Sequence, residues 1–277
     1  MNARTFTTCL LLALATFAWS LGGAQQQWRP THVVIIFDTT KSFWSNLHIA
    51  HAITERLLRG LHYALPGHPD DAMTFIVLNA TPTIVTELSG LDLRRKAARA
   101  FINAFSNPDP RLGTDVVTAL ELADLAFSRQ PQSLKFLFIF SDLIVDPART
   151  PRGLIPFRPL TAFDWSRLND VSIWVFLCPS EVEMKVKREI PALNRALFFS
   201  PPPMTNGIVE KENLQAFTDR IAQKFQAELM QRLQEAPRSD PAGSVNPFKF
   251  LGILFGVLAA LLVMLIALSR LKGGERR

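Results

Sequence analysis

Short runs of apolar, β-forming residues alternate with segments of helical period, and this alternation is the feature that most constrains the fold. The runs with strand character lie at residues 32–37, 73–78, 83–88, 134–140, 171–177 and 196–199. The segments with apolar residues at helical spacing lie at residues 46–63, 91–105, 115–128, 182–195 and 210–235. This order predicts an α/β domain with a doubly wound, mostly parallel sheet.

Both ends of the chain are too apolar to belong to that domain. Near the start, Arg4 precedes an apolar run at residues 8–19, and small residues at 21–24 match a signal-peptidase site. An uncleaved N-terminal anchor is the alternative. Near the other end, residues 250–269 contain no charged side chain, and a helix of that length matches a hydrocarbon core about 30 Å thick. We therefore expect a signal peptide at 1–24, a domain at 25–235, a linker at 236–247, a transmembrane helix at 248–270 and a tail at 271–277.

The charges beside the apolar segment predict its orientation. Basic residues outnumber acidic ones after it and are Arg270, Lys272, Arg276 and Arg277. A basic flank normally faces the cytoplasm, so the domain is expected on the outer side of the membrane. Much of the net charge of +6 lies in this tail, so it is no indication of nucleic-acid binding. After signal cleavage Cys178 would be the remaining cysteine, and the lack of a disulfide favours a bacterial envelope protein. With the apolar segment, this predicts a single-pass protein of a bacterial inner membrane with a periplasmic domain.

The apolar segment also carries small residues at a spacing that permits close helix pairing. Gly252, Gly256 and Ala260 form a small-xxx-small ridge along one side of a helix. This ridge would allow pairing with another membrane helix through Gly252 and Gly256, and the alternative is a chance arrangement of small residues in an apolar helix.

Oxygen-bearing side chains follow several of the predicted strands. Asp38, Thr40 and Ser42 come directly after the first strand on alternate residues, so all three can point the same way from an extended turn. Thr114 precedes a predicted helix, and Asp142 follows the strand at 134–140. In an open parallel sheet, ligands bind outside the carboxyl ends of the strands. Two carboxylates and three hydroxyls make a hard oxygen site that suits Mg²⁺ or Mn²⁺ and leaves a coordination position for an outside group.

These five residues closely resemble the metal-ion-dependent adhesion site of von Willebrand factor type A domains. That family has Asp-x-Ser-x-Ser after its first strand, a Thr before a later helix and an Asp after the next central strand. The resemblance covers about residues 30–235. It implies a Rossmann-like fold and a non-enzymatic module in which the hydroxyls of Thr40, Ser42 and Thr114 reach the metal directly, while Asp38 and Asp142 act through water. It also implies a protein partner whose acidic side chain completes the metal sphere.

Two positions depart from the family pattern. Thr40 stands where Ser is usual, which keeps the hydroxyl and adds a methyl group. Leu143 stands where a Gly commonly follows the last Asp, which implies an altered loop shape. We expect the metal site to be retained despite both departures.

Other functions remain alternatives. A structural or assembly subunit of the same fold would need no metal, and its Asp38 and Thr114 would merely cap turns and helices. A phosphatase with a phosphorylated aspartate is a further alternative, since Asp38 follows the first strand. That class wants a second carboxylate at the position of Thr40 as general acid and base, and this chain lacks it.

Several other residues are better explained by packing than by chemistry. His48, His51 and His62 could suggest zinc, but no cysteine or close carboxylate completes such a site. Cys178 lies in an apolar run, which favours a buried residue over a nucleophile. The proline-rich stretch at 147–160 is expected to be irregular, and its sequence does not name a partner.

Overall fold

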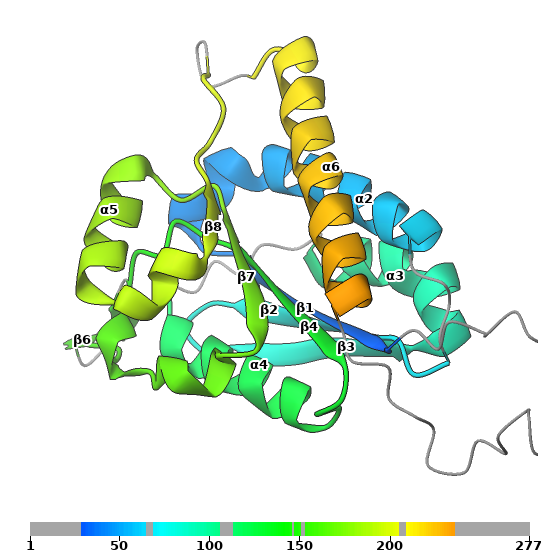
Figure 1. Ribbon diagram of the computed structural model, residues 1–277. Helices are drawn as coiled ribbons and strands as arrows, with labels where there is room; N and C mark the ends of the chain where they lie inside the picture. Colours follow the sequence, from blue (N-terminus) through cyan, green and yellow to red (C-terminus); the bar gives the residue numbers. More distant parts are fainter. Residues whose placement is uncertain are drawn as a thin grey trace, which may run out of the picture. The chain divides into compact units, whose positions relative to one another are not determined.

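A six-stranded sheet runs through the domain in the order β3-β2-β1-β4-β7-β8 (Figure 1). The structure is a computed structural model that describes residues 29–64, 69–105, 113–145, 147–150, 153–204 and 209–235. The strands are β1 (Thr31–Asp38), β2 (Ala72–Leu78), β3 (Thr83–Ser89), β4 (Leu134–Phe140), β7 (Val171–Phe176) and β8 (Leu197–Phe199). All neighbouring pairs are parallel except β2 and β3. The predicted doubly wound, mostly parallel sheet is confirmed.

The strand β1 lies at the centre because both of its sides are paired. It pairs with β2 through Asp38 opposite Leu78, and with β4 through Phe37 opposite Phe140. All residues of β1 are buried, as expected for a parallel strand covered on both faces. The chain builds the sheet outward from β1 first toward β3 and then toward β8, so the winding reverses between β1 and β4.

Three helices cover one face of the sheet: α2 (Leu47–Ala64), α3 (Gly90–Phe105) and α6 (Lys211–Glu235) (Figure 1). Alternate residues of β1 point to this face, as the period of a strand requires. Aromatic rings fill the contact with α6. Phe225 lies edge-on to Phe136, Phe138 and Trp174, with ring centroids 5.3, 5.3 and 5.8 Å apart. This edge-to-face geometry is the favoured one for aromatic pairs, so it fixes α6 on β4 and β7.

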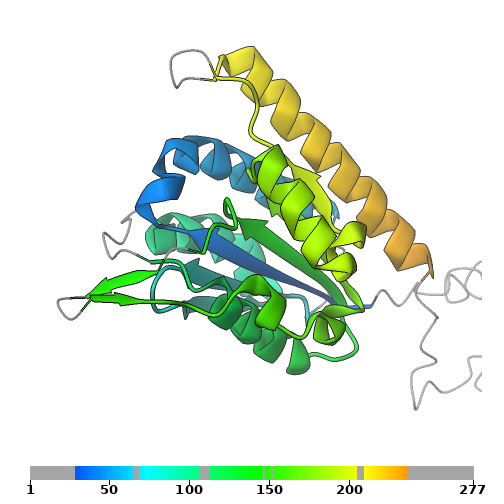
Figure 2. The same cartoon turned by 90° about the vertical axis from the view of Figure 1, so that its left-hand side faces the viewer.

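The opposite face is covered by α4 (Val116–Ser128), α5 (Ser180–Glu189) and the short 3₁₀ helices Leu160–Ala162 and Trp165–Leu168. The helix α4 presents Ala119, Ala123 and Ala126 at spacings of three and four residues, and all three are fully buried. Small side chains on the inner stripe let this helix lie close to β1 and β2. Figure 2 shows the sheet edge-on between the two helical layers.

Three local details differ from the sequence predictions. The helix predicted at 182–195 ends at Glu189 and gives way to a 3₁₀ helix at Pro191–Arg195, because Pro191 lacks the amide needed to continue an α-helix. A 3₁₀ helix at Lys41–Asn46 precedes α2. The stretch predicted to be irregular contains a hairpin of β5 (Ala148–Thr150) and β6 (Gly153–Ile155), which projects beyond the sheet in Figure 2.

The predicted signal peptide, linker, transmembrane helix and tail lie outside the described residues. Within the described ranges, none of the helices has both the length and the apolar character needed to cross a bilayer. The membrane topology therefore stays a prediction.

At the start of β1, His32 is a titratable side chain inside the core. Its Nε2 lies 3.0 Å from Thr74 Oγ1, and its ring stands edge-on to Phe127 with centroids 5.3 Å apart. Its Nδ1 is buried without a hydrogen-bond partner among the described residues. Burial, aided by the charges of Lys135 and Arg129, lowers the pKa of His32 to about 4. The imidazole is therefore neutral in the folded protein at neutral pH.

His32 should make the domain less stable as the pH falls. The unfolded chain takes up a proton near pH 6.5, whereas folded His32 takes it up near pH 4, so stability is lost across this window. We expect a loss of about 2 kcal/mol between pH 6.5 and pH 5, at about 1.4 kcal/mol per pH unit. Urea unfolding of the wild type and of His32→Gln at several pH values measures it. The difference between the two proteins should grow toward low pH, and a constant difference would contradict the buried neutral histidine.

Candidate metal site

The candidate site lies at the carboxyl ends of β1 and β4, where the winding of the sheet reverses. Asp38 is the last residue of β1, and Ser141 and Asp142 directly follow β4. The backbone is tied down on both sides of this point. The Thr39 amide donates to Leu78 O at 3.1 Å, and the Ser141 amide donates to Phe176 O at 3.3 Å. Ligands of open α/β sheets bind at this kind of switch point.

The carboxylate of Asp38 is fully buried and accepts three hydrogen bonds. Thr40 donates to Oδ1 through its amide at 2.8 Å and its hydroxyl at 2.6 Å, and Ser141 Oγ donates to Oδ2 at 2.8 Å. Burial raises the pKa of Asp38 to about 6, against the opposing effect of these hydrogen bonds, and the nearby charge of Asp142 raises it further. A carboxylate in this position gains from a neighbouring positive charge.

Two hydroxyls stand on the outer side of Asp38. Thr40 Oγ1 lies 3.1 Å from Ser42 Oγ, and Thr40 is buried while Ser42 is exposed. The hydrogen bond from the Thr40 amide to Asp38 Oδ1 closes a tight turn, which places both hydroxyls on one side of the loop. The structure therefore brings together Asp38, Thr40 and Ser42, as the alternating spacing predicts. Through Oδ1, Asp38 also caps this turn, as the alternative without a metal predicts.

Thr114 is buried, and its hydroxyl makes no hydrogen bond to any described residue. Its position is fixed by the next residue, because the Asp115 amide donates to Asn79 O at 3.0 Å, just after β2. Asp115 also caps α4 by accepting from the Thr118 amide at 3.0 Å. Thr114 is therefore not the cap of this helix, and its hydroxyl has the free lone pairs that a metal ligand requires.

Asp142 lies in the loop after β4. It is 6% exposed, and its Oδ1 accepts from the Ile144 amide at 3.0 Å. Leu143 has a φ of 58°, in the left-handed region that glycine adopts with less strain. Its side chain is buried, and this packing offsets the backbone cost.

The donor set fits a small, hard cation. Two buried carboxylates and hydroxyl oxygens are the ligands that Mg²⁺ and Mn²⁺ prefer. A buried hydroxyl without a partner costs about 1–3 kcal/mol, and Thr114 is such a group. No cluster of three His, Cys, Asp or Glu side chains able to hold a metal occurs among the described residues, so any metal here would depend on hydroxyl ligands.

Ser141 is a residue of this site that the sequence prediction left out. Its hydroxyl donates to Asp38 Oδ2 and accepts from the Leu143 amide at 3.0 Å, so it links the two loops. The sequence signal was its place between β4 and Asp142. Its role depends on the pairing of β1 with β4, which a sequence does not state.

The residues assigned to packing behave accordingly. His51 lies edge-on to Phe37 and Phe101, with ring centroids 5.6 and 5.1 Å apart, while His48 is exposed. The thiol of Cys178 is buried 3.7 Å from Asp142 O, and burial raises its pKa to about 12. A thiol with this pKa is protonated at neutral pH and is a poor nucleophile.

Comparisons with known proteins place the fold. No protein-family model matches the chain, and a search of curated proteins finds no match. A point mutant of the PilB minor pilin from Streptococcus sanguinis matches 74% of this chain and 64% of its own, at 12% identity and a TM-score of 0.51. A von Willebrand factor type A protein from Catenulispora acidiphila matches 70% of this chain and 42% of its own, at 16% identity and a TM-score of 0.46. The SpaC pilus adhesin from Lactobacillus rhamnosus GG matches 74% of this chain and 31% of its own, at 12% identity and a TM-score of 0.49.

The matched region spans less than two thirds of each of these structures. The similarity to the minor pilin establishes a shared fold and nothing more, because 12% identity does not carry function from one protein to the other. Together with the sheet order, it confirms the predicted α/β fold with a mostly parallel sheet, and the resemblance to von Willebrand factor type A domains stays a prediction.

Replacing Thr114 tests whether its buried hydroxyl lacks a hydrogen-bond partner in the protein without metal. In the presence of chelator, Thr114→Val should raise the free energy of unfolding by about 1 kcal/mol, because it removes an unsatisfied buried hydroxyl at nearly constant volume. Thr118→Val, in the first turn of the helix that follows Thr114, is the matched control, since Thr118 Oγ1 donates to Asp115 Oδ2 at 2.7 Å and its loss should destabilise. Equal losses of stability in both variants, measured by urea unfolding, would mean that Thr114 is satisfied.

Proposed function

We propose that this protein is a non-enzymatic binding module that recognises another protein through a divalent cation held at the switch point of its sheet. The observation that carries the proposal is the pairing of a buried carboxylate with a raised pKa, Asp38, and a buried hydroxyl without a partner, Thr114. Both groups are costly in the protein alone, and both are relieved by a cation.

Each predicted ligand has a role in this proposal. Thr40, Ser42 and Thr114 would supply hydroxyl oxygens to the metal, and Asp38 and Asp142 would act on it through bound water. Ser141 orients Asp38 through its hydrogen bond to Oδ2. A bound Mg²⁺ or Mn²⁺ supplies a positive charge with an open coordination position. An acidic side chain of the partner fits that position, because the exposed Ser42 leaves the outer side of the loop at the surface.

The cellular setting is part of the same proposal. A signal peptide at 1–24 and a transmembrane helix at 248–270 would hold the domain at the outer face of a bacterial inner membrane. The linker at 236–247, behaving as a flexible coil, would reach on the order of 20 Å. The domain would therefore act close to the bilayer, as one part of an envelope complex.

A metal-independent assembly subunit is the second candidate. The observation that favours it is that Thr40 and Ser141 already satisfy the Asp38 carboxylate with three hydrogen bonds. In that case Asp38 would be a structural group linking the loops after β1 and β4. A phosphatase is less compatible with the geometry, because Asp38 is fully buried and the position of the required second carboxylate is held by Thr40.

Magnesium should stabilise the protein, and Asp38→Asn should abolish that effect. At a free Mg²⁺ concentration about 100 times the dissociation constant, the expected gain is about 2.7 kcal/mol, or roughly 5–10 °C in melting temperature. The amide of Asn can still accept from Thr40 and donate to Ser141, so the variant should remain folded without metal. Thermal melts of the full-length chain with Mg²⁺, Mn²⁺ or chelator measure the shift. The same shift in wild type and Asp38→Asn would rule out this site.

Binding to the partner should depend on the metal. Affinity capture with the full-length chain, followed by identification of the bound proteins, should recover a partner in Mg²⁺ that chelator or Thr114→Val releases. Thr114→Ser retains the hydroxyl and serves as the control. A partner retained equally in chelator and by both variants would support the metal-independent subunit.

A further inference from the structure

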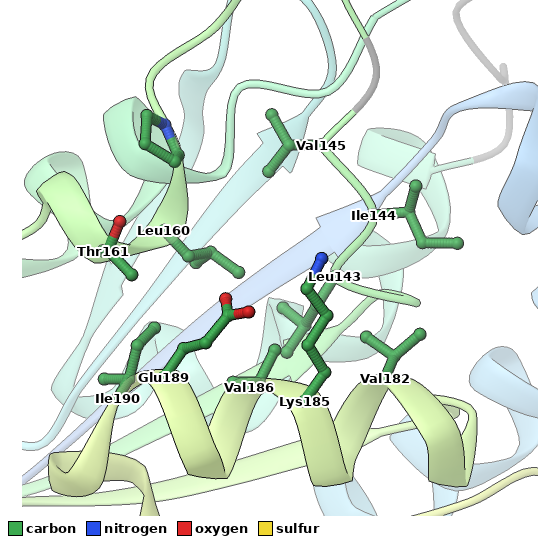
Figure 3. Close-up of a pocket in the computed structure, with 11 residues that line it drawn as sticks. Leu143, Ile144, Val145, Leu160, Thr161, Val182, Lys185, Val186, Glu189 and Ile190 are labelled. Carbon is green, nitrogen blue, oxygen red and sulfur yellow. The ribbon is translucent and has the colours of Figure 1, made fainter.

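An apolar groove of about 300 Å³ lies between α5 and the loop after β4 (Figure 3). One wall is formed by the loop after β4, and the other by α5. The floor is apolar, with Leu143, Leu160 and Val186 all buried. Ile144 stands on the rim and is 42% exposed. An exposed Ile above an apolar floor is a surface that gains from being covered.

The groove is continuous with the metal site along the chain. Asp142 belongs to the site, and the next residues, Leu143 and Ile144, line the groove. The N-terminal end of α5 meets the same place, because Cys178 packs its thiol against Asp142 O just before this helix begins. A ligand bound to the cation would therefore enter the groove at its Ile144 end.

Two side chains of opposite charge lie at different positions along the groove. Lys185 and Glu189 extend from α5 into the space between the walls (Figure 3). Neither makes a hydrogen bond or ion pair with the described residues, and the neighbouring Lys187 pairs with Glu183 instead. Lys185 lies nearer the metal end, and Glu189 lies about 13 Å along the helix from Ser180 by the rise of an α-helix. The positive charge of Lys185 nearer the site and the negative charge of Glu189 at the far end favour a ligand with an acidic group at the near end and a basic group at the far end.

We infer that the partner binds as an extended segment with an acidic, an apolar and a basic side chain at alternate positions. The acidic side chain lies at the bound cation, beside the start of α5 where Cys178 packs against Asp142, the apolar one enters the groove, and the basic one reaches Glu189. Alternate residues of an extended chain point to one face and are about 6.6–7 Å apart, so the five residues from the acidic to the basic side chain span about 13 Å. The inference rests on the proposed function for the acidic position and on the groove for the other two.

A random peptide library displayed on phage tests the inference. Selection on the full-length chain in Mg²⁺ should enrich peptides with the pattern acidic-x-apolar-x-basic, in either chain direction. Binding of a selected peptide should fall about tenfold in Thr161→Trp, because Thr161 is an exposed residue of the rim and the indole would fill the groove. Met184→Ser is the control, since Met184 is 68% exposed and does not line the groove.

Charge reversal tests the polarity. Repeating the selection on the double variant Lys185→Glu with Glu189→Lys should remove the preference for a basic residue at the far position. An unchanged preference would overturn the assigned order of charges.

The outcomes separate the groove from the metal site. Peptides that need Mg²⁺ and an acidic residue but show no apolar preference, and bind Thr161→Trp as well as wild type, would overturn the groove and leave the proposed function standing. Peptides with an apolar preference that bind equally in chelator would overturn the proposed function and leave the groove. A dimer in sedimentation that Thr161→Trp dissociates would mean that a second copy of this chain fills the groove, which would overturn the inference.

Discussion

The pairing of β1 with β2 on one side and β4 on the other is the constraint on which the rest of the structure depends. It places β1 inside the sheet, where both of its faces are buried, and it fixes the register of its last residues against β2 and β4. Asp38 therefore lies at the point where the chain crosses over to opposite sides of the sheet. Ser141, which follows β4, donates a hydrogen bond to it there. The helical layers follow from the same pairing, because the two sets of alternate residues on β1 each need an apolar cover.

The end of β1 concentrates groups that are unfavourable in isolation. Asp38 is fully buried with a raised pKa, Asp142 adds a second carboxylate nearby, and Thr114 holds a hydroxyl without a partner. The hydrogen bonds from Thr40 and Ser141 reduce the cost at Asp38 but leave Thr114 unrelieved. In the loop after β4, Leu143 has a left-handed backbone conformation, whose cost is offset by the burial of its side chain. Several unfavourable groups gathered at the end of one strand are typical of a site kept for a ligand.

The elements that the sequence predicts well are those decided by burial. The runs that became β1 and β4 are almost wholly apolar because both faces are covered, and α6 carries its apolar stripe over many turns. The hairpin of β5 and β6 escaped prediction because strands of three residues have no measurable period. Pro191 was a readable signal for the end of α5. The role of Ser141 and the groove depend on which distant segments become neighbours, and no local pattern encodes this.

A cation alone would make a poor choice among partners, because acidic side chains are common on protein surfaces. Coordination contributes affinity for one carboxylate, whereas selectivity must come from the surface around it. The groove of Ile144, Lys185 and Glu189 is built from α5 and the loop that carries Asp142, so it is held in register with the site. An apolar pocket selects partners by the shape of their apolar side chain. Two unpaired charges of opposite sign select them by the order of acidic and basic residues along the peptide. Placing both beside a metal site lets a short peptide segment be recognised by position as well as by charge.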